Sequence, residues 1–131
     1  MSETQPFLRL TYISTARGPM DDQFMAFVSR MQERNAANGI GGVLIYNGLN
    51  FIETLEGTPA AVERAFERVS NDTHQSGVRV IDRMTGDARL FNGWSYVDAE
   101  RLGGQIPPLT HRLLPEKLER AYRSFMTLSA R

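Results

Sequence analysis

Residues 34–57 read RNAANGIGGVLIYNGLNFIETLEG, and this stretch predicts the centre of the fold. Two strand-like runs, 42–46 and 51–56, flank the dipeptide Asn47–Gly48. Asn-Gly favours a type I′ turn, because both central residues of that turn need a positive φ angle. We therefore predict a hairpin of two strands, closed either by this tight turn or by a slightly longer loop that takes in 49–50.

The segments around the hairpin predict two helices and three further strands. Asp21 or Asp22 is a suitable N-cap for the first helix. Thr58 and Pro59 suit the start of the second, because Thr caps well and Pro is favoured in the first turn. The expected elements are, in order, a strand over 7–14, a helix after Met20, strands over 42–46 and 51–56, a helix from Thr58, and strands over 78–84 and 94–97.

This order contains the split β-α-β arrangement of ferredoxin-like folds. We predict an α+β, ferredoxin-like β-α-β-β-α-β-β sandwich over residues 1–100, with two helices on one face of a mixed sheet. Residues 101–131 are expected to form a linker and an amphipathic C-terminal helix from about Pro115. That helix is expected either to cover the other face of the sheet or to join two subunits of a homo-oligomer.

Composition excludes several classes of function. Fifteen basic and fifteen acidic residues cancel, so we expect no nucleic-acid or membrane-surface partner. No apolar run approaches the ~20 residues that span a bilayer, and no secretory signal begins the chain, so a cytoplasmic location is expected. The absence of cysteine and the wide separation of His74 and His111 argue against a metal site. No phosphate loop or acid/base constellation is evident, so we expect no enzymatic activity.

Five polar residues interrupt the apolar faces of these elements: Tyr12, Asn35, Glu53, Arg68 and Asp72. Each has a structural explanation: a Tyr hydroxyl bonded to a backbone carbonyl, an Asn that caps a helix, an exposed Arg–Asp pair. Together they come from two strands and two helices that meet over one sheet face. A bound polar, planar molecule would satisfy them jointly, with Gly41 and Gly42 leaving room for it.

Four segments carry a resemblance to a known family. They are LRLTYIS at 8–14, the stretch 34–57, ERVSNDTHQ at 67–75 and FNGWSYV at 91–97. In order and spacing, residues 7 to about 98 resemble a BLUF (blue light using flavin) photoreceptor domain of the short single-domain type. The Leu55–Glu56–Gly57 triplet followed by its helix is a specific part of this pattern.

The resemblance implies that a flavin, FAD or alternatively FMN, binds between the two helices. Tyr12 would give an electron and a proton to the excited flavin, and Asn35 would bond the polar edge of its ring. Trp94 matches a tryptophan common on the last strand of the family. The other implied cofactor contacts are Ser14 beside the tyrosine, Ile40 and Phe51 along the ring, and Arg68 and Asp72 near the ribityl or phosphate portion.

The sequence departs from the family pattern at the photoactive positions. The family has a glutamine where this chain has Glu53, and a methionine where it has Tyr96. A glutamine amide carries a donor and an acceptor and can exchange which one faces the flavin, whereas an ionised carboxylate only accepts. We therefore expect a flavin-binding blue-light sensory domain that signals through protein contacts with a weakened or altered photocycle. The alternative is a degenerate protein-interaction module without flavin or light response.

Overall fold

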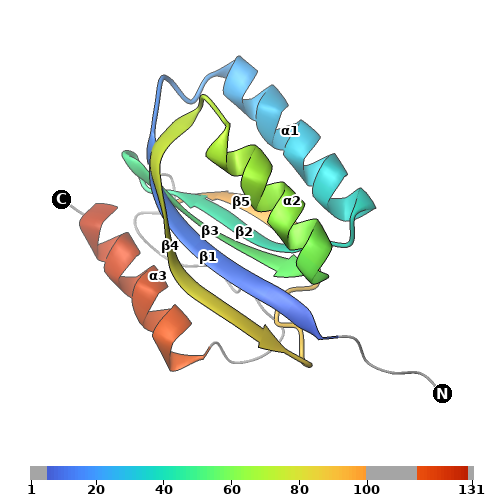
Figure 1. The fold of residues 1–131 in the computed structure, drawn as a ribbon. Helices are drawn as coiled ribbons and strands as arrows, with labels where there is room; N and C mark the ends of the chain where they lie inside the picture. The colour runs from blue at the N-terminus through green and yellow to red at the C-terminus, as the bar shows by residue number, and fades with distance from the viewer. Residues whose placement is uncertain (1–5, 100–114, 130–131) are drawn as a thin grey trace.

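The computed structural model describes residues 6–99 and 115–129 (Figure 1). It confirms the expected order of elements and the α+β class. The segment 101–114, predicted as a linker, lies outside the described residues. The elements are β1 (Phe7–Ala16), α1 (Asp22–Ala37), β2 (Gly41–Tyr46), β3 (Asn50–Gly57), α2 (Pro59–Ser70), β4 (Gln75–Gly86), β5 (Trp94–Asp98) and α3 (Glu116–Ser129).

The five strands form one mixed sheet in the order β4-β1-β3-β2-β5. β2 and β5 run parallel, and the other neighbouring pairs are antiparallel. β1 therefore lies between β3 and β4, and its Tyr12 pairs with Glu53 of β3. Because side chains alternate along a strand, these two residues project from the same face of the sheet.

The connection between β2 and β3 is the longer of the two expected loops. β2 ends at Tyr46 and β3 begins at Asn50, and Gly48 alone in this loop has a positive φ, of 98°. The Asn47 side chain explains why the tight turn does not form. Its Oδ1 accepts hydrogen bonds from the backbone N–H of Leu49 at 3.1 Å and of Asn50 at 2.7 Å. This closes an Asx-type turn that a type I′ geometry would not allow.

Helices α1 and α2 cover one face of the sheet (Figure 1). Asp21 caps α1 by accepting from the N–H of Phe24 at 3.1 Å, and Thr58 caps α2 by accepting from Ala61 at 3.3 Å. These caps satisfy backbone donors that a helix start leaves unpaired. The core under the two helices includes Leu8, Leu10, Tyr12, Phe24, Val28, Ile40, Leu44, Phe51, Leu55, Ala61, Val62, Ala65, Val69 and Trp94.

Gly42 is required by the strand pairing, not by a ligand. Its φ is 141°, and a Cβ there would lie 1.8 Å from the carbonyl oxygen of Thr54 on β3. A Cβ on Gly41 would lie 3.1 Å from the Cβ of Phe91. The expectation that these two glycines leave room for a bound molecule is therefore wrong, because neighbouring backbone and side chains occupy that space.

Helix α3 covers the opposite face of the sheet (Figure 1). Its residues Leu118 and Tyr122 are almost fully buried against Val43 and Ile52 of the sheet. Within this interface the Tyr122 hydroxyl and the Thr54 hydroxyl share a hydrogen bond. Of the two expected placements for this helix, the structure shows the packing against the sheet. None of the helices in the described part of the chain is long and apolar enough to cross a membrane.

Deletion of residues 111–131 is expected to cause aggregation. It would expose the core that α3 covers, and an uncovered apolar patch of that kind promotes association. Size-exclusion chromatography and binding of a hydrophobic dye to the truncated and full chains would measure the effect. A soluble monomer with an unchanged melting temperature would show that α3 is dispensable.

Candidate functional site

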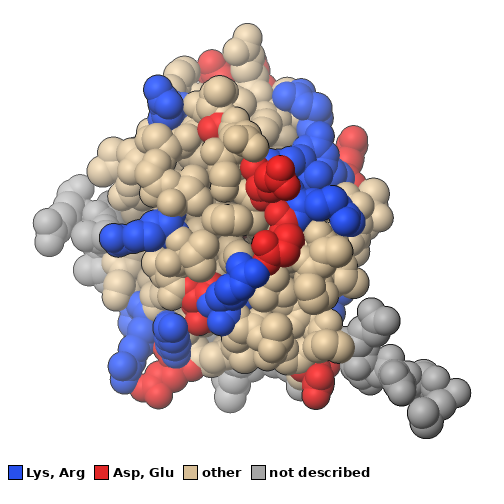
Figure 2. All heavy atoms as spheres, in the orientation of Figure 1, with Lys and Arg blue, Asp and Glu red and all other residues tan. Residues whose placement is uncertain are grey.

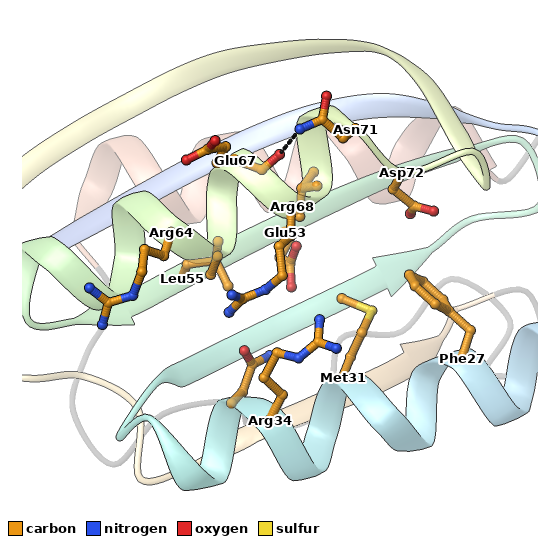
Figure 3. Close-up of a pocket in the computed structure, with 13 residues that line it drawn as sticks. Phe27, Met31, Arg34, Glu53, Leu55, Arg64, Glu67, Arg68, Asn71 and Asp72 are labelled. Atoms are coloured by element: carbon orange, nitrogen blue, oxygen red, sulfur yellow. Dashed lines mark hydrogen bonds between the residues drawn. The ribbon is translucent and has the colours of Figure 1, made fainter.

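A cavity of about 520 Å³ lies between α1 and α2 above the sheet (Figure 3). Its volume is within the range of small-molecule sites. Phe27, Met31 and Arg34 project into it from α1, and Arg64 and Arg68 project from α2 (Figure 3). The full lining is Phe27, Met31, Arg34, Asn35, Glu53, Leu55, Arg64, Ala65, Glu67, Arg68, Val69, Asn71 and Asp72.

The floor of the cavity holds a fully buried carboxyl group, that of Glu53. The Tyr12 hydroxyl donates a hydrogen bond to Glu53 Oε1. Trp94 Nε1 donates to Glu53 Oε2 at 2.9 Å. The β1–β3 register and the parallel β2–β5 pairing bring these three side chains together from three strands. Both carboxyl oxygens of Glu53 thus accept a hydrogen bond from the protein.

Burial raises the pKa of Glu53 from 4.5 to about 7. The hydrogen bonds from Tyr12 and Trp94 lower this pKa, and the charge of Asp72 raises it. The pKa of Tyr12 is raised well above its usual value by burial, then by the charge and hydrogen bond of Glu53. Near neutral pH Tyr12 therefore keeps its proton, while Glu53 is divided between the acid and the carboxylate.

A second polar cluster is centred on Asp72, at the end of the cavity. Asp72 Oδ1 accepts from the His74 backbone N–H at 2.9 Å and lies 2.8 Å from its Nδ1. Asp72 Oδ2 accepts from Gln75 Nε2 at 3.1 Å. The sequence suggested an Arg68–Asp72 pair as one explanation of these residues. The structure instead gives Asp72 to His74 and Gln75.

Three guanidinium groups lie along the cavity, those of Arg34, Arg64 and Arg68 (Figure 3). The pKa of Arg68 is lowered by partial burial and then by the positive charges of Arg34 and Arg64. Figure 2 shows basic and acidic side chains side by side over α1 and α2. Cations that destabilise one another favour a bound anion, because its charge relieves their repulsion.

The predicted site residues divide into two groups. Asn35, Glu53, Arg68 and Asp72 line the cavity, and Asn35 is 4% exposed. Tyr12 and Trp94 reach it through Glu53. The others lie outside its lining: Ile40 and Phe51 are in the core, where Phe51 stacks on Phe24 at 5.8 Å and Tyr96 meets the same ring edge-on, and Ser14 bonds Gln75.

Several lining residues were missed by sequence reasoning. Phe27 and Met31 read as ordinary core positions of a helix, and Arg64 as a solvated charge. Their shared spacing on the inward sides of two facing helices was the signal available. Gln75 was missed because its strand begins earlier than the alternating pattern suggested, at 75 and not at 78.

Comparison with known proteins agrees with this geometry. The family model described as "Sensors of blue-light using FAD" matches residues 7–97. A photoactivated adenylate cyclase subunit beta-like protein FB of Euglena gracilis is 36% identical over 104 residues, which are 76% of this chain and 12% of that protein. The chain thus spans about an eighth of that relative's length.

Solved structures of the same kind superpose closely. The structure described as BlrP1 BLUF has a TM-score of 0.73 at 29% identity, and the match covers 95% of this chain and 88% of that one. The structure of Klebsiella pneumoniae BlrP1 with FMN and cyclic diGMP has a TM-score of 0.78 at 27% identity. In that case the match covers 92% of this chain and 34% of the other.

Proposed function

The chain belongs to the BLUF family of flavin-binding blue-light sensors, and we propose that it binds a flavin between α1 and α2 as a sensory domain. Its output would pass through contacts with other proteins, since none of the described clusters suggests catalysis. The observation that carries this proposal is the buried Glu53–Tyr12–Trp94 cluster in the wall of the cavity. A buried carboxyl group with a raised pKa, facing an open cavity, is typical of a functional site.

Asn35 supports a flavin ring as the occupant. Its side chain lies in the cavity wall, and the residue is almost fully buried. An amide offers both a donor and an acceptor, which suits the alternating carbonyl and N–H groups at the polar edge of an isoalloxazine. Leu55, Ala65 and Val69 supply the apolar wall that the flat faces of such a ring need.

The arginines support a flavin that carries phosphate, FAD or FMN. Guanidinium groups bind phosphate through paired, charge-assisted hydrogen bonds. Arg34 and Arg64 come from different helices and both act electrostatically on Arg68, so a phosphate between the helices would meet more than one of them. Asp72 is committed to His74 and Gln75, which leaves the arginines to bind the anion.

The chemistry of the site rests on Tyr12 and Glu53. A bound flavin would supply the absorption of blue light and the acceptor for an electron from Tyr12. The Tyr12 hydroxyl already donates to Glu53, so the carboxylate is placed to accept the tyrosine's proton. Glu53 cannot invert its hydrogen bonds as a glutamine can, which favours an altered photocycle. The same residue favours the second candidate function, a BLUF module that acts by protein contact without a light response.

Purified protein is expected to contain a flavin, and Asn35→Ala should weaken its binding. Unpairing the polar edge of the ring costs about 1–3 kcal/mol, or roughly a 5- to 150-fold higher Kd. Chromatography of the flavin released on denaturation, and titration of flavin-free protein with FAD, FMN and riboflavin, would measure this. Asn92→Ala, an exposed asparagine outside the cavity, is the matched control. If no flavin co-purifies and none binds on reconstitution, the proposed function is wrong.

A further inference from the structure

Gln75 is a buried amide that lies beside Tyr12 on the side away from Glu53. It is 5% exposed and begins β4, which borders β1 opposite to β3. Its Oε1 accepts from the Ser14 hydroxyl at 2.6 Å, and its Nε2 donates to Asp72 Oδ2 at 3.1 Å. Two polar groups from two segments therefore hold one side-chain amide within the site.

These contacts fix which end of the amide is the donor. An ionised carboxylate only accepts hydrogen bonds, so the NH₂ end must face Asp72 and the oxygen must face Ser14. Asp72 is itself held by the backbone N–H and the ring of His74. An NH₂ group has two hydrogens, and only one of them is used by Asp72.

The other hydrogen acts on Tyr12. Burial and Glu53 raise the pKa of the Tyr12 phenol, whereas a hydrogen bond from the Gln75 side chain lowers it. A donor to the phenol oxygen has this effect because it stabilises the anion. A hydroxyl that accepts from one side must send its own proton elsewhere, and the acceptor present is Glu53 Oε1.

We propose that Gln75 is a positioning residue that directs the hydroxyl proton of Tyr12 onto Glu53. Asp72 and Ser14 orient the amide, the amide orients the hydroxyl, and the hydroxyl serves Glu53 as a donor. The site thus keeps a side-chain amide in contact with its tyrosine, on the β4 side and not on the β3 side. The importance of the Tyr12–Glu53 pair rests on the proposed light-sensing function, but the orientation itself does not.

The tryptophan gives a readout that needs no flavin. Trp94 is the single tryptophan of the chain, and its indole N–H donates to Glu53. The indole N–H resonance and the fluorescence of flavin-free full-length protein should therefore report the ionisation of Glu53 near pH 7. The other charged or titratable groups that face Glu53 or share its cavity are Tyr12, Asp72, His74, Arg34 and Arg68.

Gln75→Met removes the donor while keeping an unbranched side chain of similar length. The Tyr12 hydroxyl is then free to turn away from Glu53, so the carboxylate loses part of its stabilisation. The Trp94-reported midpoint should rise by roughly half a pH unit or more. Gln75→Leu is the second variant, and Ser14→Ala is the matched control that leaves the donor end of the amide in place. The melting temperature of each variant confirms that it is folded at the pH of measurement.

A double-mutant comparison tests whether Gln75 acts through Tyr12. In a Tyr12→Phe background no hydroxyl remains to be directed, so adding Gln75→Met should leave the midpoint unchanged. A shift that persists in that background would mean that Gln75 acts on Glu53 through Asp72, and would overturn the proposal. So would an unchanged midpoint in both Gln75 variants. Failure of flavin to bind in a separate titration would contradict the proposed function and leave this result intact.

Discussion

Glu53→Gln is expected to stabilise the protein at pH 8 by about 2–3 kcal/mol, with a difference that disappears near pH 4. The folded-state pKa of Glu53 is raised from 4.5 to about 7, so between these values the folded protein holds a proton that the unfolded chain has released. Stability from this group is fully present below pH 4.5 and is lost as the pH rises through 7. A neutral glutamine carries no such penalty. Urea unfolding of both proteins from pH 4 to pH 9 would measure the difference.

Glu56 provides the control on the same strand. It is also fully buried, but its side chain faces the other side of the sheet and pairs with Arg9 at 3.3 Å. It also accepts from the backbone N–H groups of Leu90 and Phe91. Glu56→Gln should therefore destabilise the protein by several kcal/mol at every pH, because Arg9 would be left without its buried partner. A Glu53→Gln effect that does not vary with pH would show that Glu53 is already ionised throughout.

The architecture was predictable because local and non-local signals agree in it. Asp21 and Thr58 cap the helices as expected, and the apolar stripe from Pro115 forms a helix with a buried face. The alternation of Tyr12 and Glu53 with apolar neighbours predicted that both face the helices. These features depend on periodicity and capping, which a single sequence displays directly.

The details that failed depend on contacts between segments distant in sequence or on side-chain hydrogen bonds. The hairpin loop is longer than an Asn-Gly turn because the Asn47 side chain takes two backbone donors. Gln75 meets Tyr12 only through the β1–β4 pairing, whose register shifts at two bulges. No local pattern reports such a meeting. The resemblance to BLUF domains located Glu53 but could not show that both its oxygens are already bonded to Tyr12 and Trp94.

The light response should be nearly absent in the flavin-loaded wild type and restored by one substitution. BLUF domains are marked by a small red shift of flavin absorption on blue illumination, which needs a side chain able to present either a donor or an acceptor. Above pH 7 Glu53 is mainly ionised and only accepts, so we expect little or no shift at pH 8–9. Below pH 6 the acid form carries one donor, and a partial shift is expected.

Glu53→Gln should give a full shift that is independent of pH, because an amide can accept from Trp94 and donate to Tyr12 or reverse these roles. Adding Tyr12→Phe should abolish the shift, since the donor of the electron and proton is gone. Light-minus-dark spectra of wild type, Glu53→Gln and Tyr12→Phe/Glu53→Gln across pH 5–9 would test this, with flavin content measured in each sample. A normal, pH-independent shift in the wild type would mean that the signal does not depend on residue 53. Attention would then pass to Gln75, the amide that contacts Tyr12 from the other side.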